Sequence, residues 1–319
     1  MLDKLKIASY RFSINAVEPL QLPEHKGGTL RGAFGTVFKQ IACARGGKVC
    51  AGACERKEHC AYGYIFETPV PADAAVLKNL SDVPRPFVIE PPLDRKTRYA
   101  VSESLDWRVV LIGNGIQHVP YFVLAFKMLG AVGIGKGRGK FTLEKVEAVH
   151  PFQESVKPVY SAADGALRAE ELSVRFADLQ ERARAFPPDC VTVQFLTPTR
   201  IKHQNDWVTQ PDFHILIRAI LRRVSSLYYF HCGEQWETDY RGIIAQAQQI
   251  ETTRAQTRWV EWERYSARQD KKIELGGFVG EASYKGNLES FLPLLLIGQL
   301  AHVGKACVFG NGQYELQAR

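Results

Sequence analysis

Two of the eight histidines stand beside cationic residues in patterns that suit acid–base chemistry. His25 is followed by Lys26 and then by Arg31, and His203 follows Lys202 in a second group. An imidazole titrates near neutral pH and can take or give a proton, whereas a Lys or Arg side chain can stabilise developing negative charge. His25, Lys26, Arg31 and His203 are therefore the candidate catalytic residues. His25 ranks first, and a solvated turn is its alternative role.

Four cysteines lie close together in the order Cys43, Cys50, Cys54 and Cys60, with six, three and five residues between them. Four thiolates at this spacing can form a tetrahedral site, and thiolates favour zinc or an iron–sulfur cluster. Such a metal would be structural, because the protein would fill every coordination position. The spacing is wider than the CxxC pairs of zinc ribbons, so four reduced thiols in a loop are the alternative.

The composition fits a folded protein with a polyanionic partner. The 319 residues include 41 Lys and Arg against 34 Asp and Glu, and the whole excess of +7 lies in residues 1–150. This length predicts about two domains. A basic half suits a polyanion such as nucleic acid, and a solvated basic surface is the alternative.

Two features bear on where the chain is expected to work. The longest apolar stretch has eight residues, far short of the roughly twenty that a membrane span needs, so no membrane partner is expected. The first residues lack the pattern of a signal peptide, which predicts a cytoplasmic protein with reduced cysteines.

Residues 1–150 show alternating and helical patterns in a definite order. We expect strands over 7–17, 62–66, 87–89, 105–112 and 140–146, because apolar residues there alternate or cluster in short runs. Between them, apolar residues three and four apart predict helices over 29–41 and 119–129. Gly27 and Gly28 suggest a loop before the first helix, with Thr29 as its N-cap.

Residues 189–319 repeat the same order. The patterns predict strands near 190–197, 257–265, 272–284 and 313–316, and helices over 213–224, 240–250 and 292–303. A polar helix is expected over 166–185, before this second copy. In both halves a glycine-rich loop precedes the last strand. We therefore expect an α+β protein of two ferredoxin-like βαββαβ domains, a plan shared with RNA-binding RRM modules. The domains are 1–150, with a cysteine-bearing insertion at 43–60, and 189–319, joined by a linker at 151–188.

Three cationic groups are candidates for RNA binding. The first is a glycine-rich loop whose bare backbone and cations suit phosphate, the second is the polar face of a long helix, and the third is a hairpin that mixes cations with polar residues. The residues are Lys136, Arg138 and Lys140, then Arg218 and Arg222, then Arg264, Arg268, Gln269 and Lys272. A solvated face or a tight turn is the alternative for each group.

Several segments resemble one family. The run from Arg264 to Gln269, the glycines from 276 to 280 and the segment from Gly304 to Tyr314 resemble the C-terminal domain of CRISPR-associated repeat-processing endoribonucleases, the Cas-six family of the RAMP superfamily. The N-terminal sequence LRGAFG, from residue 30, also resembles one branch of that family. The resemblance implies that Gly304, Lys305, Gly310 and Gly312 lie along the RNA.

The resemblance further implies a reaction. Members of this family cleave CRISPR repeat RNA without a metal cofactor, by attack of a 2′-hydroxyl that leaves a 2′,3′-cyclic phosphate and a 5′-hydroxyl. The partners would be precursor and mature CRISPR RNA and other subunits of a CRISPR effector complex. Two alternatives remain open: a non-catalytic RAMP subunit that holds guide RNA, and a metal-stabilised RNA-binding protein outside CRISPR systems.

Overall fold

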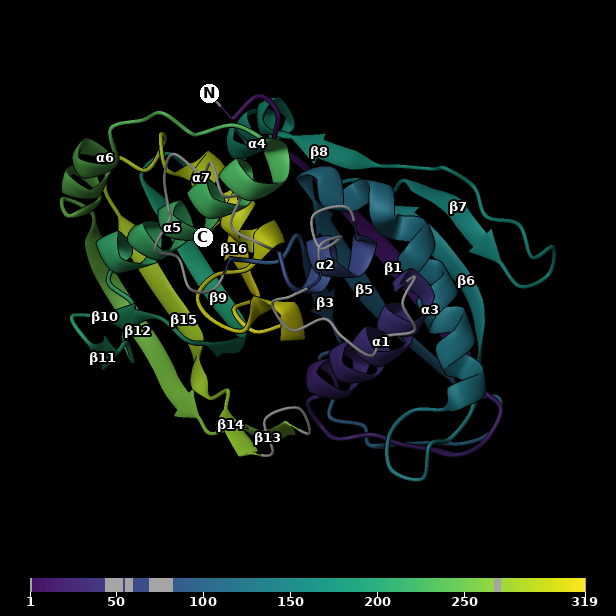
Figure 1. Cartoon of the computed structure of the whole chain (residues 1–319). Helices are drawn as coiled ribbons and strands as arrows, with labels where there is room; N and C mark the ends of the chain where they lie inside the picture. Colours follow the sequence, from purple (N-terminus) through teal and green to yellow (C-terminus); the bar gives the residue numbers. More distant parts are fainter. Residues whose placement is uncertain (1, 44–53, 55–59, 69–82, 267–270, 319) are drawn as a thin grey trace. The chain divides into compact units, whose positions relative to one another are not determined.

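The computed structural model of the chain describes residues 2–43, 54, 60–68, 83–266 and 271–318. It divides into two units (Figure 1). The N-terminal unit consists of Lys6–Ser173 with Phe230–Cys232, and the C-terminal unit consists of Met1–Leu5, Val174–Tyr229 and Gly233–Arg319.

The N-terminal unit is built on an antiparallel sheet with the strand order β3-β5-β1-β6-β7, and β8 also pairs with β1. If β1, β3, β5 and β6 are numbered 1 to 4 along the chain, their order in the sheet is the 2-3-1-4 of a ferredoxin-like domain, and β7 and β8 are two added strands. Its elements are β1 (Lys6–Ala16), β2 (Leu20–Gln21), α1 (Gly27–Ala42), α2 (Ala61–Phe66), β3 (Phe87–Glu90), β4 (Arg98–Tyr99), β5 (Ser104–Ile112), a 3-10 turn (Gly113–His118), α3 (Val119–Val132), β6 (Phe141–Val149), β7 (Val156–Ser161) and β8 (Ser173–Arg175).

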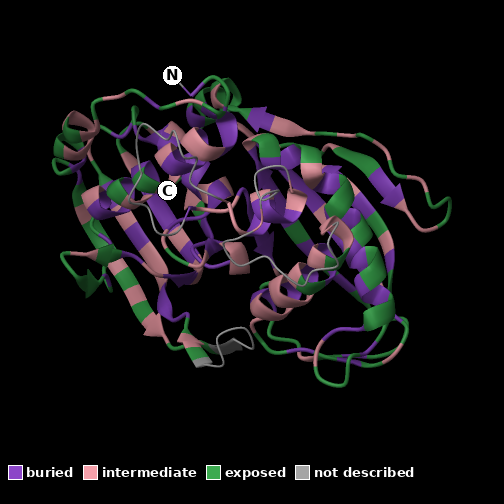
Figure 2. Ribbon diagram, in the orientation of Figure 1, coloured by how far each residue is buried: buried purple, intermediate pink, exposed green. Residues whose placement is uncertain are grey.

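An aromatic cluster joins the two long helices of this unit to the sheet. The ring of Phe34 in α1 lies 4.5 Å from that of Phe122 and 5.0 Å from that of Phe126, both in α3. Phe126 in turn lies 5.1 Å from Phe12 in the central strand β1. All four rings are buried, as the purple core of Figure 2 illustrates. Phenylalanines at helical spacing therefore hold α1 and α3 on the sheet, as the sequence pattern predicts.

Two local expectations in this unit are wrong. Residues 61–66 form the helix α2 rather than a strand, because Tyr62, Ile65 and Phe66 are buried at spacings of three and one, which a single helical face provides. Phe66 packs against Phe34 of α1. The helix α1 begins at Gly27, so the glycines that suggested a loop lie in its first turn.

The C-terminal unit repeats the plan with the sheet order β12-β15-β9-β16, again the order 2-3-1-4. Its elements are α4 (Phe176–Ala183), β9 (Cys190–Thr199), β10 (Lys202–His203), β11 (Asp206–Trp207), α5 (Phe213–Cys232), α6 (Tyr240–Ala247), β12 (Glu251–Val260), β13 (Glu263–Ser266), β14 (Lys271–Glu274), β15 (Gly277–Lys285), α7 (Leu292–Ala301), a 3-10 turn (Cys307–Phe309) and β16 (Tyr314–Gln317). The expected α+β fold of two ferredoxin-like domains is thus confirmed.

The segment 151–188, expected to be a linker, is divided between the units. β7 pairs with β6 and β8 pairs with β1, so both strands extend the N-terminal sheet. The helix α4 contacts α7 in the C-terminal unit. Leu179 of α4 is fully buried, and this anchor explains why the segment is ordered structure.

Among the residues that the structure describes, no helix is long and apolar enough to cross a membrane.

Candidate functional site

One end of the C-terminal sheet gathers most of the candidate residues of that unit. Strand β9 ends where β15 begins, since Thr199 pairs with Phe278, and β12 ends beside them, since Val260 pairs with Gly277. The hairpin β10–β11 follows β9 here, the hairpin β13–β14 joins β12 to β15 here, and the glycine-rich loop 304–312 leads into β16 here. Sheet topology therefore brings three segments together that lie far apart in the sequence.

The glycine-rich loop is fixed to the end of β9 by backbone hydrogen bonds. The Lys305 N–H donates to Arg200 O at 2.9 Å, and the Gly312 N–H donates to Pro198 O at 3.1 Å. Gly304 and Gly312 have positive φ, and a Cβ at Gly312 would lie 1.9 Å from Val303 O. Close packing requires glycine at both positions, and their expected contact with RNA stays a prediction. The exposed side chain in the loop is the cation Lys305.

Two cations flank the exposed ring of Trp207 in β11. The Arg200 guanidinium lies 4.0 Å from the ring centroid, and Lys305 Nζ lies 5.4 Å from it. Arg200 is held by Glu274, whose carbonyl oxygen accepts from Nη1 at 2.6 Å. A tryptophan with cations beside it suits single-stranded nucleic acid, because the ring stacks on a base and the cations meet phosphate.

His203 lies in the same hairpin. Its ring centroid is 5.9 Å from that of His214 at the start of α5. Burial lowers the pKa of His214, and the charges of His203 and Arg218 lower it further against the opposing effect of Asp212. The structure thus places His203 beside a second histidine, a neighbour that the sequence spacing does not reveal.

The cations of α5 have different roles. Arg218 and Arg222 are exposed and one turn apart, as expected. Arg223 instead donates from Nε to Ala301 O at 2.7 Å, at the C-terminal end of α7, where a cation is favoured by the helix dipole.

The hairpin β13–β14 can be described only in part. Lys272 is exposed and pairs with Glu263 at 3.1 Å. Arg264 lies in β13, where its backbone pairs with Ile273. Arg268 and Gln269 lie outside the described residues.

In the N-terminal unit, His25 and Lys26 precede α1 but differ in what surrounds them. Lys26 is completely buried, and its Nζ lies 3.1 Å from both Asp94 O and Asp94 Oδ1. A phosphate cannot reach an ammonium in that position. The assignment of Lys26 as a catalytic cation is therefore corrected: Lys26 holds the segment 23–28 against residue 94.

His25 is half-buried, and its pKa lies below the ordinary histidine value. Burial is the main cause, because it disfavours the charged imidazolium; Glu24 opposes it, and the charges of Arg95 and Lys26 add to it. A neutral imidazole at pH 7 is an acceptor of protons, as a general base must be.

Exposed cations lie around this segment, and some of them are absent from the sequence-based candidates. Arg95 is 72% exposed, and Arg98 is exposed in β4, which pairs with β2 immediately before His25. The sequence signal for them is the charged run 94–98, which lies between the strands expected over 87–89 and 105–112. Arg31, by contrast, lies with its guanidinium 4.9 Å from the Phe66 ring and is half-buried.

The loop 133–139 bonds some of its N–H groups within the protein and exposes two cationic side chains. The Lys136 N–H donates to Gln21 O, and the Ile134 N–H donates to Gly139 O. These two N–H groups are therefore bonded within the protein, and the approach of the loop's glycine N–H groups to phosphate stays a prediction. The side chains of Lys136 and Arg138 are exposed, whereas Lys140 pairs with Glu18 at 3.3 Å.

The four cysteines can be placed only in part. Cys60 Sγ lies 3.8 Å from Ala42 O, the residue before Cys43, so the end of α1 and the start of α2 bring two of the four close together. Cys50 lies outside the described residues. Within the part of the chain that the structure describes, no three potential metal ligands form a group.

Two family models match adjoining parts of the chain. Residues 5–172, more than half of the sequence, match AF_1859_N, which is described as an N-terminal domain. Residues 193–314 match the model of the CRISPR-associated endoribonuclease Cas6. The boundary between the two matches agrees with the division of the structure into units near residue 173.

Solved structures of Cas6 proteins share the fold. A Cas6 product complex superposes with a TM-score of 0.57 at 14% identity, covering 98% of this chain and 99% of that one. Thermus thermophilus Cas6 gives 0.55 at 13% identity with the same coverage. A partial Cas6-RT-Cas1–Cas2 complex gives 0.57 at 14% identity, covering all of this chain, which spans about half (47%) of that chain's length. No curated protein sequence matches the chain.

Proposed function

We propose that this chain is a member of the Cas6 family of CRISPR-associated proteins and an endoribonuclease that cleaves CRISPR repeat RNA to release mature CRISPR RNAs. The match of residues 193–314 to the Cas6 endoribonuclease model carries this proposal. The cationic and aromatic side chains at the end of the C-terminal sheet support it, because that match includes Arg200, Trp207 and Lys305.

The proposed reaction is an internal transesterification that needs no metal ion. The 2′-oxygen before the cut bonds to the adjacent phosphorus, and the bond from phosphorus to the 5′-oxygen breaks. A base takes the 2′-proton, and an acid gives a proton to the departing 5′-oxygen. The products are a 2′,3′-cyclic phosphate and a 5′-hydroxyl.

His25 is the proposed base, because its lowered pKa leaves the imidazole neutral at pH 7. Arg95 replaces Lys26 as the proposed cation for the phosphorane, since it is exposed and its charge acts on His25. His203, beside His214, remains the second candidate histidine.

The proposed partners are repeat RNA and other CRISPR proteins in the cytoplasm. One solved relative is a Cas6 product complex, and another lies in a complex with RT, Cas1 and Cas2. The exposed cations of both units suit the RNA.

A direct assay separates an enzyme from a non-catalytic RNA-binding subunit. The protein is incubated with the repeat RNA of its own CRISPR array and with the reversed sequence, and the products are mapped by gel. A single cut in the repeat alone is expected. Tight binding of the repeat without any cut would contradict the enzyme and support the subunit.

Arg222→Ala is expected to weaken RNA binding and to lower the slope of log K against log salt by about one, because an exposed cation releases about one counterion from RNA. The rate at saturating protein should stay nearly unchanged. Filter binding at several salt concentrations measures the slope. Lys285→Ala is the control, because it removes one exposed cation at the end of β15 that lies away from the candidate site. Equal slopes for Arg222→Ala and the wild type would exclude Arg222 from the RNA interface.

We also propose that Cys43, Cys50, Cys54 and Cys60 bind one structural zinc ion or iron–sulfur centre. The support is the run of four thiols and the approach of Cys60 to the end of α1. Freshly purified protein should contain about one equivalent of zinc, or iron for a cluster. Protein that is active yet free of both metals would contradict this proposal.

Cys54→Ser is expected to lower both the metal content and the midpoint of thermal unfolding, because binding of a structural metal is coupled to folding. Circular dichroism measures the midpoint, and elemental analysis measures the metal. Cys190→Ser, outside the group, is the control and should keep the metal.

A further inference from the structure

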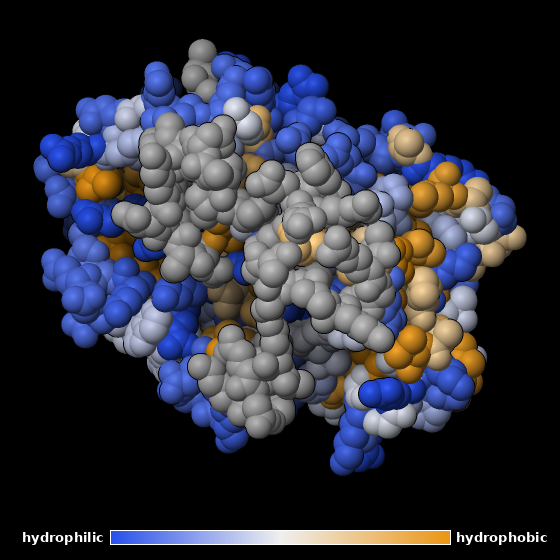
Figure 3. All heavy atoms as spheres, viewed as in Figure 1, coloured by the Kyte–Doolittle hydropathy of each residue, from blue (hydrophilic) through white to orange (hydrophobic). Residues whose placement is uncertain are grey.

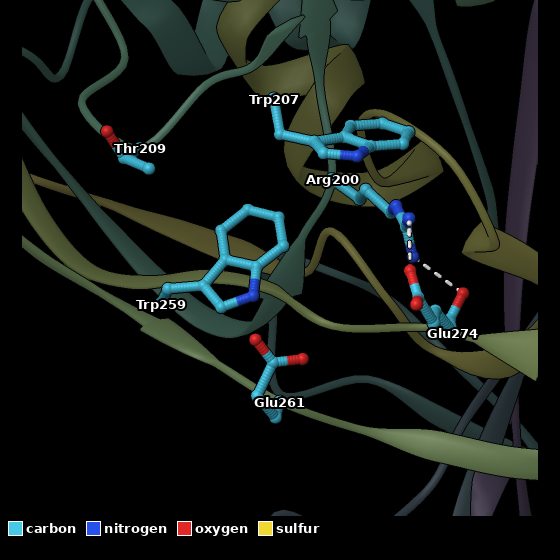
Figure 4. Close-up of a pocket in the computed structure, with 6 residues that line it drawn as sticks. All are labelled: Arg200, Trp207, Thr209, Trp259, Glu261 and Glu274. Atoms are coloured by element: carbon cyan, nitrogen blue, oxygen red, sulfur yellow. Dashed lines mark hydrogen bonds and ion pairs between the residues drawn. The ribbon is translucent and has the colours of Figure 1, made fainter.

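A pocket of about 340 Å³ opens beside Trp207 at the end of the C-terminal sheet (Figure 4). Its walls combine aromatic rings, carboxylates and one guanidinium. The lining residues are Arg200, Trp207, Thr209, Trp259, Glu261 and Glu274. The volume lies at the small end of ligand pockets and suits one flat polar ring system.

Strand β12 and the segment that follows β11 build the pocket. Thr257 and Trp259 are two residues apart in β12 and so lie on one face of the strand. Thr257 Oγ1 donates to Thr209 O at 2.6 Å, which fixes the segment after β11 over that face. Trp259 and Trp207, which are 52 residues apart in the sequence, therefore line the same cavity.

The charged side chains that line the pocket differ in their interactions with the rest of the protein. Arg200 binds the main chain and, at 3.4 Å, the carboxylate of Glu274, and it also covers the Trp207 ring at 4.0 Å. Figure 4 shows this group on one side of the pocket, with Trp259 and Glu261 together on the other. Glu261 is exposed and forms no ion pair or hydrogen bond with the rest of the described chain. Its carboxylate is the acceptor left for a ligand.

We propose that this pocket binds one unpaired guanine of the RNA, an inference that rests on the proposed function. The base stacks on Trp259, and its N1–H and exocyclic N2–H donate to the two oxygens of Glu261. A carboxylate only accepts hydrogen bonds, and guanine alone among the four bases carries an imino and an amino donor side by side. Lys305, on the rim beside Trp207, contacts the flanking phosphate.

The test uses single-stranded RNAs of nine nucleotides, which are all uridine except for the central one. Quenching of tryptophan fluorescence measures the binding of each RNA. The central nucleotide is guanosine, inosine or adenosine. The base of inosine keeps N1–H and lacks the exocyclic amine. Guanine is expected to bind about tenfold more tightly than inosine, because a hydrogen bond to a charged group is lost. Equal affinities for guanine and inosine would overturn the proposal.

Variants test which side chains produce the preference for guanine. Glu261→Gln should remove the preference for guanine over inosine, whereas Glu251→Gln, the same change at the other end of β12, should keep it. Trp259→Ala should weaken the binding of all three RNAs by about tenfold, because the stacking is lost, and Trp259→Phe should restore most of the affinity. A guanine preference that survives Glu261→Gln would place the base elsewhere.

Cleavage of the repeat RNA, measured on the same preparations, separates the two proposals. A wild-type protein that cuts the repeat but does not distinguish guanine from inosine would overturn the guanine pocket alone. A protein that neither binds nor cuts any RNA would overturn both.

Discussion

His25→Ala is expected to slow cleavage of repeat RNA by about 10²- to 10⁴-fold, the usual range for loss of a general base. RNA affinity should change little, because one neutral imidazole contributes little to binding phosphate. Single-turnover kinetics at saturating protein report the chemical step apart from binding. The expectation rests on the half-buried position of His25 and on the cations around it.

His150→Ala is the matched control for His25→Ala. His150 belongs to the same unit, and its Nδ1 accepts a hydrogen bond from Phe152 N–H at 3.2 Å. This variant should cleave at the wild-type rate. If His25→Ala also cleaves within a few-fold of wild type, His25 is not the base, and His203→Ala becomes the next variant to measure.

The pH dependence follows from the direction of the pKa shift. The neutral imidazole is the active form of a base, so the single-turnover rate should rise with pH and level off above the pKa of His25. Because burial lowers that pKa, half of the maximal rate should be reached below about pH 6.5, the ordinary histidine value. A rate that falls between pH 6 and pH 8 would instead identify a histidine acid as limiting.

The order of elements could be predicted from the sequence because it depends on local periodicity. Phe34 and Phe38 recur at helical spacing, and they do lie on the buried face of α1. The strand expected over 62–66 is wrong, because so short a run fits a strand or a helix equally well. The choice was made by packing of Phe66 against Phe34, a tertiary contact.

The site was predicted less completely because its contacts are long-range. Nothing near Lys26 in the sequence indicates that Asp94, 68 residues away, pairs with it. Trp207 lies four residues after His203 in the sequence, but its association with Trp259 depends on how the segment after β11 lies over β12. The periodicity of a sequence predicts which side chains share one face of a strand. Which other segment packs on that face depends on the tertiary fold.

We propose above that this chain cleaves repeat RNA through the 2′-hydroxyl without a metal ion. The most direct measurement compares the natural repeat with one that carries a single 2′-deoxynucleotide before the cut, both in excess chelator, with the ends of the products identified. Circular dichroism in the same buffer verifies that chelation has not unfolded a domain held by a structural metal. We expect the natural RNA to be cut to a 2′,3′-cyclic phosphate and a 5′-hydroxyl, and we expect the deoxy substitution to abolish the cut. Cleavage of the deoxy RNA, or loss of cleavage by folded protein in chelator, would contradict it.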